Sequence, residues 1–236
     1  LNREIELFTV GDDPDLDQRL VKYDCVASMV HAKMLGKMGI LKNKEVKQLA
    51  AELENIIKLH KNGQFPITSD QEDCHTAIEN HLTEKLGDLG KKIHTARSRN
   101  DQVLTALRLF YKDQIQECEE LIDGLIEPME SFIKRSGEML LPGYTHMRKA
   151  MPSSVAMWGS AFVDSMKDNQ KLLDAVLGLI DQSPLGTAAG YGLPLKIDRE
   201  FTARELGFER VQENPIYAQN SRGKFETSLL HALSQI

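Results

Sequence analysis

The sequence predicts an all-α protein with a small N-terminal helical domain, residues 1–94, and a central bundle of long helices, residues 95–236. Two observations predict this fold class. Apolar residues recur at intervals of three and four along most of the chain, and no long run alternates with the period of two that is typical of a half-buried strand. The 236 residues are enough to bury a sizeable core.

Three helices are expected in the N-terminal domain. Apolar residues at helical spacing run through residues 16–40 and again through 45–60. The second run ends at 61–63, Lys-Asn-Gly, a typical C-terminal cap. A third helix is expected over 76–86, and residues 91–95 link it to the part of the chain that follows.

A much longer helix is expected over residues 99–133, because its apolar positions alternate by three and four for over four heptads. At 1.5 Å per residue, about 35 residues span roughly 50 Å. Such a rod needs partners along its whole face, which predicts a long bundle and subunits that pack side by side. Pro128 should kink or interrupt it. A second long helix is expected over 153–180, and a third from Gln219 to Ile236, where no stop signal occurs. We therefore expect the bundle to be incomplete at its C-terminal end.

Composition excludes several classes of function. The formal net charge of −6 argues against a general role at nucleic acids or membrane surfaces. Cys25, Cys74 and Cys118 are odd in number and widely spaced, so neither a zinc site nor a disulfide framework is predicted, and a reducing compartment fits best. No apolar run approaches about 18 residues, and the N-terminus lacks a signal-peptide pattern. We expect a cytoplasmic protein with no metal, membrane or nucleic-acid partner.

The most informative segment is 94–102, His-Thr-Ala-Arg-Ser-Arg-Asn-Asp-Gln. Ser98 and Asp101 make a Ser-x-x-Asp capping pattern, so a helix should begin near Arg99 with its free backbone N–H groups and positive dipole end exposed. Arg97 and Arg99 lie beside that end and favour a bound carboxylate or phosphate. The alternative is a capped helix whose arginines pair with acids of the chain itself.

Two loops separate the long helices. The first, 141–152, has proline near both ends and contains Thr145 and His146. An imidazole titrates near neutrality and acts as a base toward carbon only when positioned and desolvated, so a bystander histidine is the alternative. The second loop, 183–192, is rich in glycine. No strand is expected before it and no Gly-Lys-Ser follows, so its glycines are interpreted as permitting close packing at a helix terminus.

These motifs resemble those of argininosuccinate lyases. Residues 94–102 resemble the family's His-Thr-Gly-Arg-Ser-Arg-Asn-Asp-Gln signature, with Ala96 in place of the glycine, and residues 142–146 resemble its second signature. The order and spacing of three further segments agree: Glu-Asp-Cys-His at 72–75, Ser-Pro-Leu-Gly at 183–186 and Asp-Arg at 198–199. The resemblance extends over essentially the whole chain. If position 96 needs a positive φ, the alanine there should be strained.

The resemblance implies a fumarase/aspartase-like fold and a homotetramer with active sites shared between subunits. It implies a reversible anti elimination of argininosuccinate to arginine and fumarate, used in arginine biosynthesis, by general acid–base chemistry and with no cofactor. His146 is the implied catalytic residue. The implied substrate-binding residues are Asn100, Thr145, Arg99, Ser98 and Arg97, and candidates of second rank are His75, His94, Gln219 and Arg222.

The resemblance leaves two alternatives open. A third superfamily signature, Gly-Ser-Ser-x-Met-Pro, carries another catalytic residue and is absent from residues 1–236, so we expect this piece alone to be inactive. One alternative is a sister lyase acting on another succinyl adduct such as adenylosuccinate. The other is a catalytically inactive structural homologue, as lens crystallins of this family are.

Overall fold

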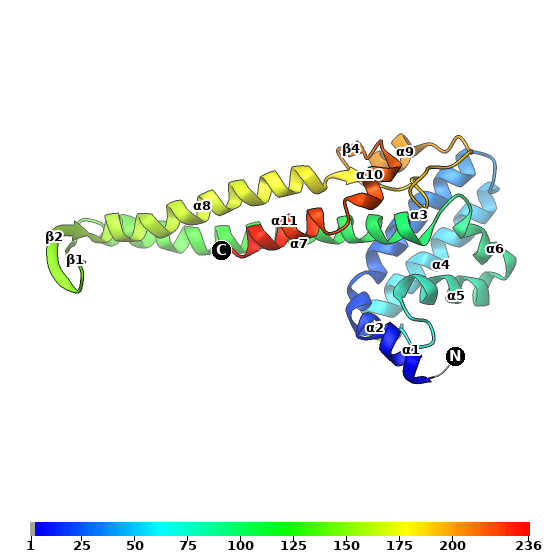
Figure 1. Cartoon of the computed structure of the whole chain (residues 1–236), viewed down its shortest axis with the longest axis horizontal. Coiled ribbons are helices and arrows are strands. Elements are labelled where there is room, and N and C mark those ends of the chain that lie inside the picture. The colour runs from blue at the N-terminus through cyan, green and yellow to red at the C-terminus, as the bar shows by residue number, and fades with distance from the viewer. Residues whose placement is uncertain (1–2) are drawn as a thin grey trace. The chain divides into compact units, whose positions relative to one another are not determined.

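The computed structural model describes residues 3–236 and is mostly helical, which confirms the predicted fold class (Figure 1). The chain divides into two compact units. Unit 1 comprises Leu1–Tyr111 and Asp181–Arg222, and unit 2 comprises Lys112–Ile180 and Gly223–Ile236. The predicted domain boundary between residues 94 and 95 stays a prediction. None of the described helices combines the length and apolar character that crossing a membrane requires.

Unit 1 is built around three helices that contact one another, α3 (Val21–Lys37), α4 (Asn43–Lys61) and α5 (Cys74–Leu86). Leu49, Leu53 and Ile56 recur at helical spacing on α4 and are fully buried, which is the apolar stripe seen in the sequence. Shorter elements complete the N-terminal part: α1 (Arg3–Val10), α2 (Asp13–Leu16), η1 (Asp17–Arg19), α6 (Asp88–Lys91) and η2 (Lys92–His94).

A later segment of the chain completes unit 1. It contains β3 (Gln182–Ser183), α9 (Arg199–Glu205), β4 (Arg210–Val211) and α10 (Pro215–Asn220), and β3 pairs with β4 in parallel. Leu185, Ala203 and Phe208 of this segment are buried in one cluster with Ala27 and Val30 of α3. This shared core joins the segment to unit 1 although it follows the long helices in sequence.

Unit 2 is a set of long helices. The helix α7 (Arg99–Ser136) begins in unit 1 and provides the first helix of unit 2, and α8 (Val155–Ile180) returns antiparallel to it. Lys167 of α8 pairs with Glu130 of α7 at 2.7 Å. Pro128 does not interrupt α7. Pro128 lacks a backbone N–H, so the carbonyl four residues earlier has no helical donor. Because Pro128 is exposed, solvent can donate to that carbonyl instead.

The single helix predicted from Gln219 to Ile236 is wrong. The chain forms α10, ending at Asn220, and a separate helix α11 (Lys224–Leu233). Gly223 between them has a φ of 81°, a left-handed conformation that breaks helical geometry and that glycine adopts without steric cost.

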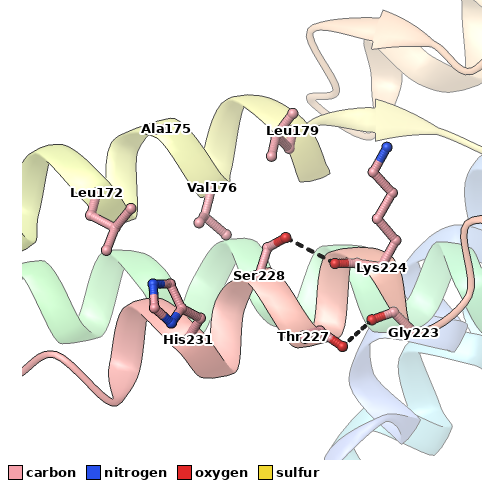
Figure 2. A pocket seen from close by; sticks show the side chains of 9 residues that line it. All are labelled: Leu172, Ala175, Val176, Leu179, Gly223, Lys224, Thr227, Ser228 and His231. Atoms are coloured by element: carbon pink, nitrogen blue, oxygen red, sulfur yellow. Dashed lines mark hydrogen bonds between the residues drawn. The ribbon is translucent and has the colours of Figure 1, made fainter.

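The helix α11 packs against α8, and an apolar groove of about 610 Å³ lies between them (Figure 2). On α8 it is lined by Leu172, Ala175, Val176 and Leu179. The Ser228 hydroxyl on α11 donates to the carbonyl oxygen of Lys224 at 2.9 Å in the same helix. The α8 side of the groove is therefore apolar, whereas the α11 side includes the polar side chains of Lys224 and His231.

The segment 141–152 was expected to be an ordered loop and is instead part of a β-hairpin. Strand β1 (Leu140–Thr145) pairs antiparallel with β2 (Arg148–Ser154), with Thr145 opposite Arg148 and an irregularity between Pro142 and Tyr144. The two turn residues, His146 and Met147, have φ values of 49° and 62°. Two-residue hairpin turns of this kind favour Asn-Gly, because both positions need a positive φ.

Candidate functional site

The start of α7 has the cap that the sequence predicts. The Ser98 backbone N–H donates to Asp101 Oδ1 at 2.9 Å, and the Asn100 N–H donates to Ser98 Oγ at 3.3 Å. The helix begins at Arg99, as expected. Ala96, which replaces the glycine of the resembling signature, has a φ of 59°. A non-glycine residue in this region stores strain of about 1–3 kcal/mol, so the loop before α7 is held by its surroundings.

Asp101 has a second role that the sequence did not indicate. Its Oδ2 accepts hydrogen bonds from the backbone N–H groups of Gly186 and Ala188, both at 2.9 Å. Burial raises the pKa of Asp101, although these donors, the Ser98 N–H and the Arg97 charge act to lower it. The glycine-rich loop 183–192 is therefore fastened to the start of α7, in agreement with the packing interpretation.

Arg97 is buried rather than presented to a ligand. Its side chain is about 1% exposed, and its Nη1 donates to Ser28 Oγ of α3 at 2.7 Å. Next to Ser28 lies Asp24, which is fully buried and accepts two hydrogen bonds from the Gln102 amide at 3.0 and 2.9 Å. Arg97 and Gln102 thus fasten both sides of the α7 start to α3.

His75 completes this buried cluster. Its Nδ1 lies 3.1 Å from Asp24 Oδ2. Burial opposes charge on both groups, but their mutual attraction prevails: the pKa of Asp24 lies well below its usual range and that of His75 is raised. We call Asp24, Ser28, His75, Arg97 and Gln102 the Asp24 network. The sequence analysis identified His75 and Arg97 but missed Asp24. The one indication of Asp24 in the sequence is that an acidic residue occurs within an apolar stripe.

Arg99 and His94 also pair with acids of the chain. Arg99 Nη1 contacts both Asp73 oxygens, at 2.6 and 2.8 Å, and Thr76 Oγ1 at 3.1 Å. Asp73 caps α5 by accepting from the Thr76 N–H at 2.7 Å. His94 Nδ1 lies 2.9 Å from Glu79 Oε1. These contacts agree with the alternative given above, in which the side chains pair with acids of the chain itself. Either side chain would have to give up its acidic partner to bind a ligand.

The solvent side of the α7 start holds the remaining predicted residues of unit 1. Arg222 is exposed, and its Nη2 donates to Asn100 Oδ1 at 3.0 Å. The Asn100 amide donates to Ser98 Oγ at 3.3 Å. Gln219 Nε2 reaches the carbonyl of Ala188 at 3.4 Å. An exposed guanidinium and a side-chain amide beside the positive end of a helix are together suited to bind a carboxylate.

Thr145 and His146 belong to unit 2 and lie at the tip of its hairpin. Both are exposed, and Met147 beside them is 97% exposed. Among residues 3–236 the structure gives the His146 imidazole no hydrogen-bond partner. Unit 2 by itself therefore does not provide the desolvation that would suit His146 to removing a proton from carbon.

Comparisons with known proteins agree with these motifs. The family model described as Lyase matches residues 10–235. Argininosuccinate lyase of Thermotoga neapolitana is 56% identical over 236 residues, which are all of this chain and 59% of that protein. Argininosuccinate lyase of Parabacteroides distasonis is 44% identical over the whole chain and 53% of its own length.

A solved structure shares the fold. An EDDS lyase variant with bound fumarate superposes with a TM-score of 0.83 at 22% identity, over 92% of this chain and 42% of that one. This similarity confirms the predicted fumarase/aspartase-like fold, and it concerns the fold alone. The chain spans a little over half the length of the curated relatives that it matches.

Proposed function

The chain belongs to the lyase family whose model it matches, and we propose that it is the part of an argininosuccinate lyase that binds a substrate carboxylate and carries one acid–base group. The observation that carries the proposal is 56% identity to an argininosuccinate lyase across all 236 residues. The capped start of α7, with Ser98 and Asn100 beside Arg222, supports it.

The proposed reaction is the reversible anti elimination of argininosuccinate to arginine and fumarate. A base removes a proton from the carbon next to a carboxylate, and the C–N bond then breaks as the leaving nitrogen is protonated. Charge accumulates on the carboxylate between these events, so fixed donors there lower the barrier. We assign this role to the Asn100 amide and the Arg222 guanidinium, with Ser98 holding Asn100.

His146 is the proposed acid–base residue, with Thr145 as a neighbouring substrate contact. Its exposure in unit 2 supports a site completed by other subunits, because packing of further copies against the hairpin would desolvate the imidazole. Unit 2 exposes large apolar side chains that such packing would cover: Leu121, Leu125, Phe132, Met157, Trp158, Phe162, Leu230 and Leu233. We therefore propose a homotetramer with shared sites.

The substrate-binding roles of Arg97 and Arg99 stay predictions. The burial of Arg97 and the pairing of Arg99 with Asp73 favour positioning roles for both. His75 and His94 are assigned to the same support of the α7 start, and Gln219 to holding the loop at Ala188.

A cytoplasmic location also belongs to the proposal. The three cysteines, Cys25, Cys74 and Cys118, are all unpaired. Free thiols are typical of proteins kept in a reducing compartment, which supports this location.

The test is turnover by the protein carrying this chain together with any sequence that follows it in the gene. Argininosuccinate and adenylosuccinate are supplied separately, and fumarate is measured together with arginine or AMP. We expect fumarate and arginine from argininosuccinate only. Turnover of adenylosuccinate alone would instead identify a sister lyase, and a folded protein that cleaves neither would identify a structural homologue. Light scattering on the same sample tests the tetramer, and a monomeric mass would contradict it.

A further inference from the structure

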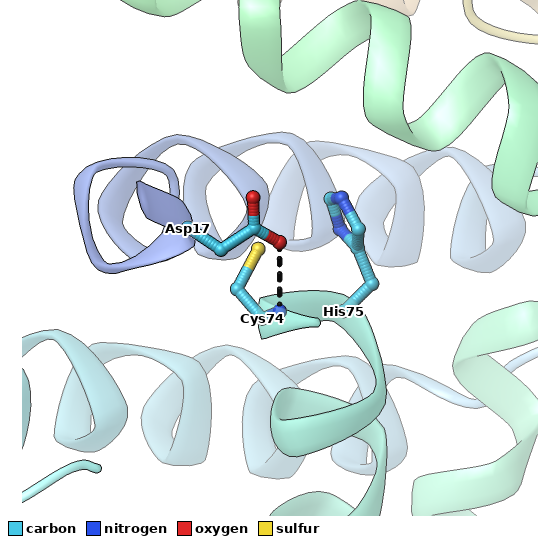
Figure 3. Close-up of side chains that lie close together, drawn as sticks. All are labelled: Asp17, Cys74 and His75. Carbon is cyan, nitrogen blue, oxygen red and sulfur yellow. Dashed lines mark hydrogen bonds between the residues drawn. The ribbon is translucent and has the colours of Figure 1, made fainter. Parts of the chain in front are cut away.

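Three side chains with metal-binding donors converge in unit 1 at a place that the proposed reaction does not use. Asp17 starts η1, and Cys74 and His75 are the first two residues of α5 (Figure 3). One donor atom from each, a carboxylate oxygen, the thiol sulfur and an imidazole nitrogen, lies within 4.8 Å of the other two. The hydrogen bond from the Cys74 backbone N–H to the Asp17 carboxylate joins the two segments across 57 positions of sequence.

We propose that Asp17, Cys74 and His75 form a binding site for one divalent metal ion of the zinc class, such as Zn²⁺ or Co²⁺. Sulfur, nitrogen and oxygen donors together suit these borderline ions, whereas Mg²⁺ and Ca²⁺ prefer oxygen alone. Three protein donors leave a fourth tetrahedral position for water. No local pattern indicated this site, because the donors do not form a Cys-x-x-Cys pattern.

The charges around Cys74 favour a cation. Burial raises the pKa of the Cys74 thiol, and the carboxylates of Asp24, Asp17 and Asp73 raise it further. A field that opposes a thiolate attracts a metal ion, whose own charge then stabilises the thiolate. Among these acids Asp24 is balanced by His75, and Asp73 by Arg99. The structure gives Asp17 no ion-pair partner within residues 3–236.

The site is largely enclosed. Cys74 and His75 are buried, at 0% and 1% exposure, while Asp17 is half-buried. Asp17 Oδ2 accepts the Cys74 backbone N–H at 3.0 Å, which leaves its other oxygen for the ion. Asp24, 3.1 Å from the His75 ring, holds the imidazole in place, as acids outside a metal's ligand shell commonly do.

Binding requires a small contraction and the loss of two protons. Ligand atoms of a tetrahedral zinc site lie ~3.5 Å apart, so the most separated donors must close by about 1 Å. The metal ion replaces the thiol proton of Cys74 and one imidazole proton of His75, both of which pass to solvent. The bound ion then ties η1 to α5 and stabilises unit 1 by mass action.

Cobalt titration of the metal-free full protein tests the proposal without reference to lyase activity. We expect one equivalent of Co²⁺ per chain, a sulfur-to-cobalt charge-transfer absorption and the strong visible bands of four-coordinate Co²⁺. Cys74→Ala should abolish the charge-transfer absorption. Cys118→Ala is the matched control, because Cys118 lies on α7 outside the cluster, and it should leave the spectrum unchanged.

A second variant keeps the test decisive if Cys74→Ala does not fold. Asp17→Asn retains an oxygen that accepts the Cys74 N–H and removes only the charge. Since losing even an outer-shell partner costs about 10–100-fold in affinity, this variant should weaken Co²⁺ binding at least ~10-fold. Absence of the charge-transfer absorption in the unmodified protein, or a spectrum that neither variant changes, would overturn the proposal.

Discussion

The start of α7 and the tip of the β1–β2 hairpin both carry predicted site residues, but they differ in burial and in the contacts that hold them. At the start of α7, Arg97 is buried and its guanidinium is bonded within the chain. At the hairpin tip, His146 and Met147 are exposed in a turn with positive φ at both positions. The first region is held in place by contacts within its own unit, whereas the described residues of unit 2 leave the second exposed.

The difference separates two kinds of functional residue. A change at the α7 start should disturb folding together with function, because the same groups hold the core. A change at the hairpin tip should disturb function alone.

The largest effect is expected at the hairpin. His146→Asn should lower kcat by ~10²–10⁴-fold, the usual cost of losing a general acid or base, and change KM far less. The His146 imidazole has no hydrogen-bond partner within residues 3–236, so we expect little change in the thermal midpoint. Steady-state kinetics and thermal unfolding of the full protein check both parts. If this variant still exchanges the carbon-bound proton while net cleavage fails, His146 is the acid for the leaving nitrogen rather than the base.

The second prediction concerns Asp24. Asp24→Ala leaves His75 buried without its counter-charge, and breaking a buried pair in this way costs about 3–5 kcal/mol of unfolding free energy. Chemical denaturation measures the loss. The matched control is Asp168→Ala, which breaks an exposed ion pair with Lys171 on α8 and should cost at most about 1 kcal/mol. Equal effects of the two changes would contradict the stated role of the Asp24 network.

Arg99→Ala distinguishes substrate binding from support. If Arg99 contacts a substrate carboxylate, kcat/KM should fall by about one to two decades, which corresponds to roughly 1.5–3 kcal/mol. The pairing with Asp73 favours the other case, a modest loss of stability with little change in kcat/KM, since Asp73 loses its partner. Asp73→Asn is the control, because it removes the pairing charge and keeps Arg99. Unchanged kinetics in Arg99→Ala would assign the arginine to structure.

The stability of unit 1 should depend on pH through His31. Its Nε2 lies 2.8 Å from the carbonyl oxygen of Thr95, and burial, aided by Arg97, lowers its pKa to about 3. The unfolded chain takes up a proton below about pH 6.5, whereas the folded chain does not until about pH 3. The contribution of His31 to the free energy of unfolding is therefore fully present above pH 6.5. Below that pH it falls by up to about 1.4 kcal/mol per pH unit, so that about 2 kcal/mol is lost at pH 5.

Denaturation at a series of pH values checks this dependence. His31→Gln should flatten the slope between pH 6.5 and 5. A slope unaffected by His31→Gln would place the linkage on other groups.

The smallest effect is expected at Met147. Met147→Gly relieves a left-handed conformation at a cost in chain entropy, so the hairpin should gain up to about 1 kcal/mol. Hydrogen exchange of the β1 and β2 amides measures this local gain. A fall in kcat with the same variant would show that the strained turn positions His146, whereas weaker protection of the amides would contradict the strain.

Local features were predictable from the sequence and distant ones were not. The cap at Ser98 and the start at Arg99 follow from four consecutive residues. Gln102 bonds Asp24 across 78 positions of sequence, and no local pattern records such a partner. The hairpin was missed because its strands contain Pro142 and Pro152, which argue against strands, and because its turn is His-Met rather than Asn-Gly.

The contact between Asp101 and Gly186 has a consequence for synthesis on the ribosome. The acceptor is made 85 residues before its donor. At about 5–20 residues per second, this interval lasts ~4–17 s. During this interval Leu185, Ala203 and Phe208 have not yet been synthesised, so they cannot cover Ala27 and Val30 of α3 as they do in the folded protein. The nascent chain therefore presents an apolar helix face for several seconds, and chaperone capture during translation should concentrate on α3.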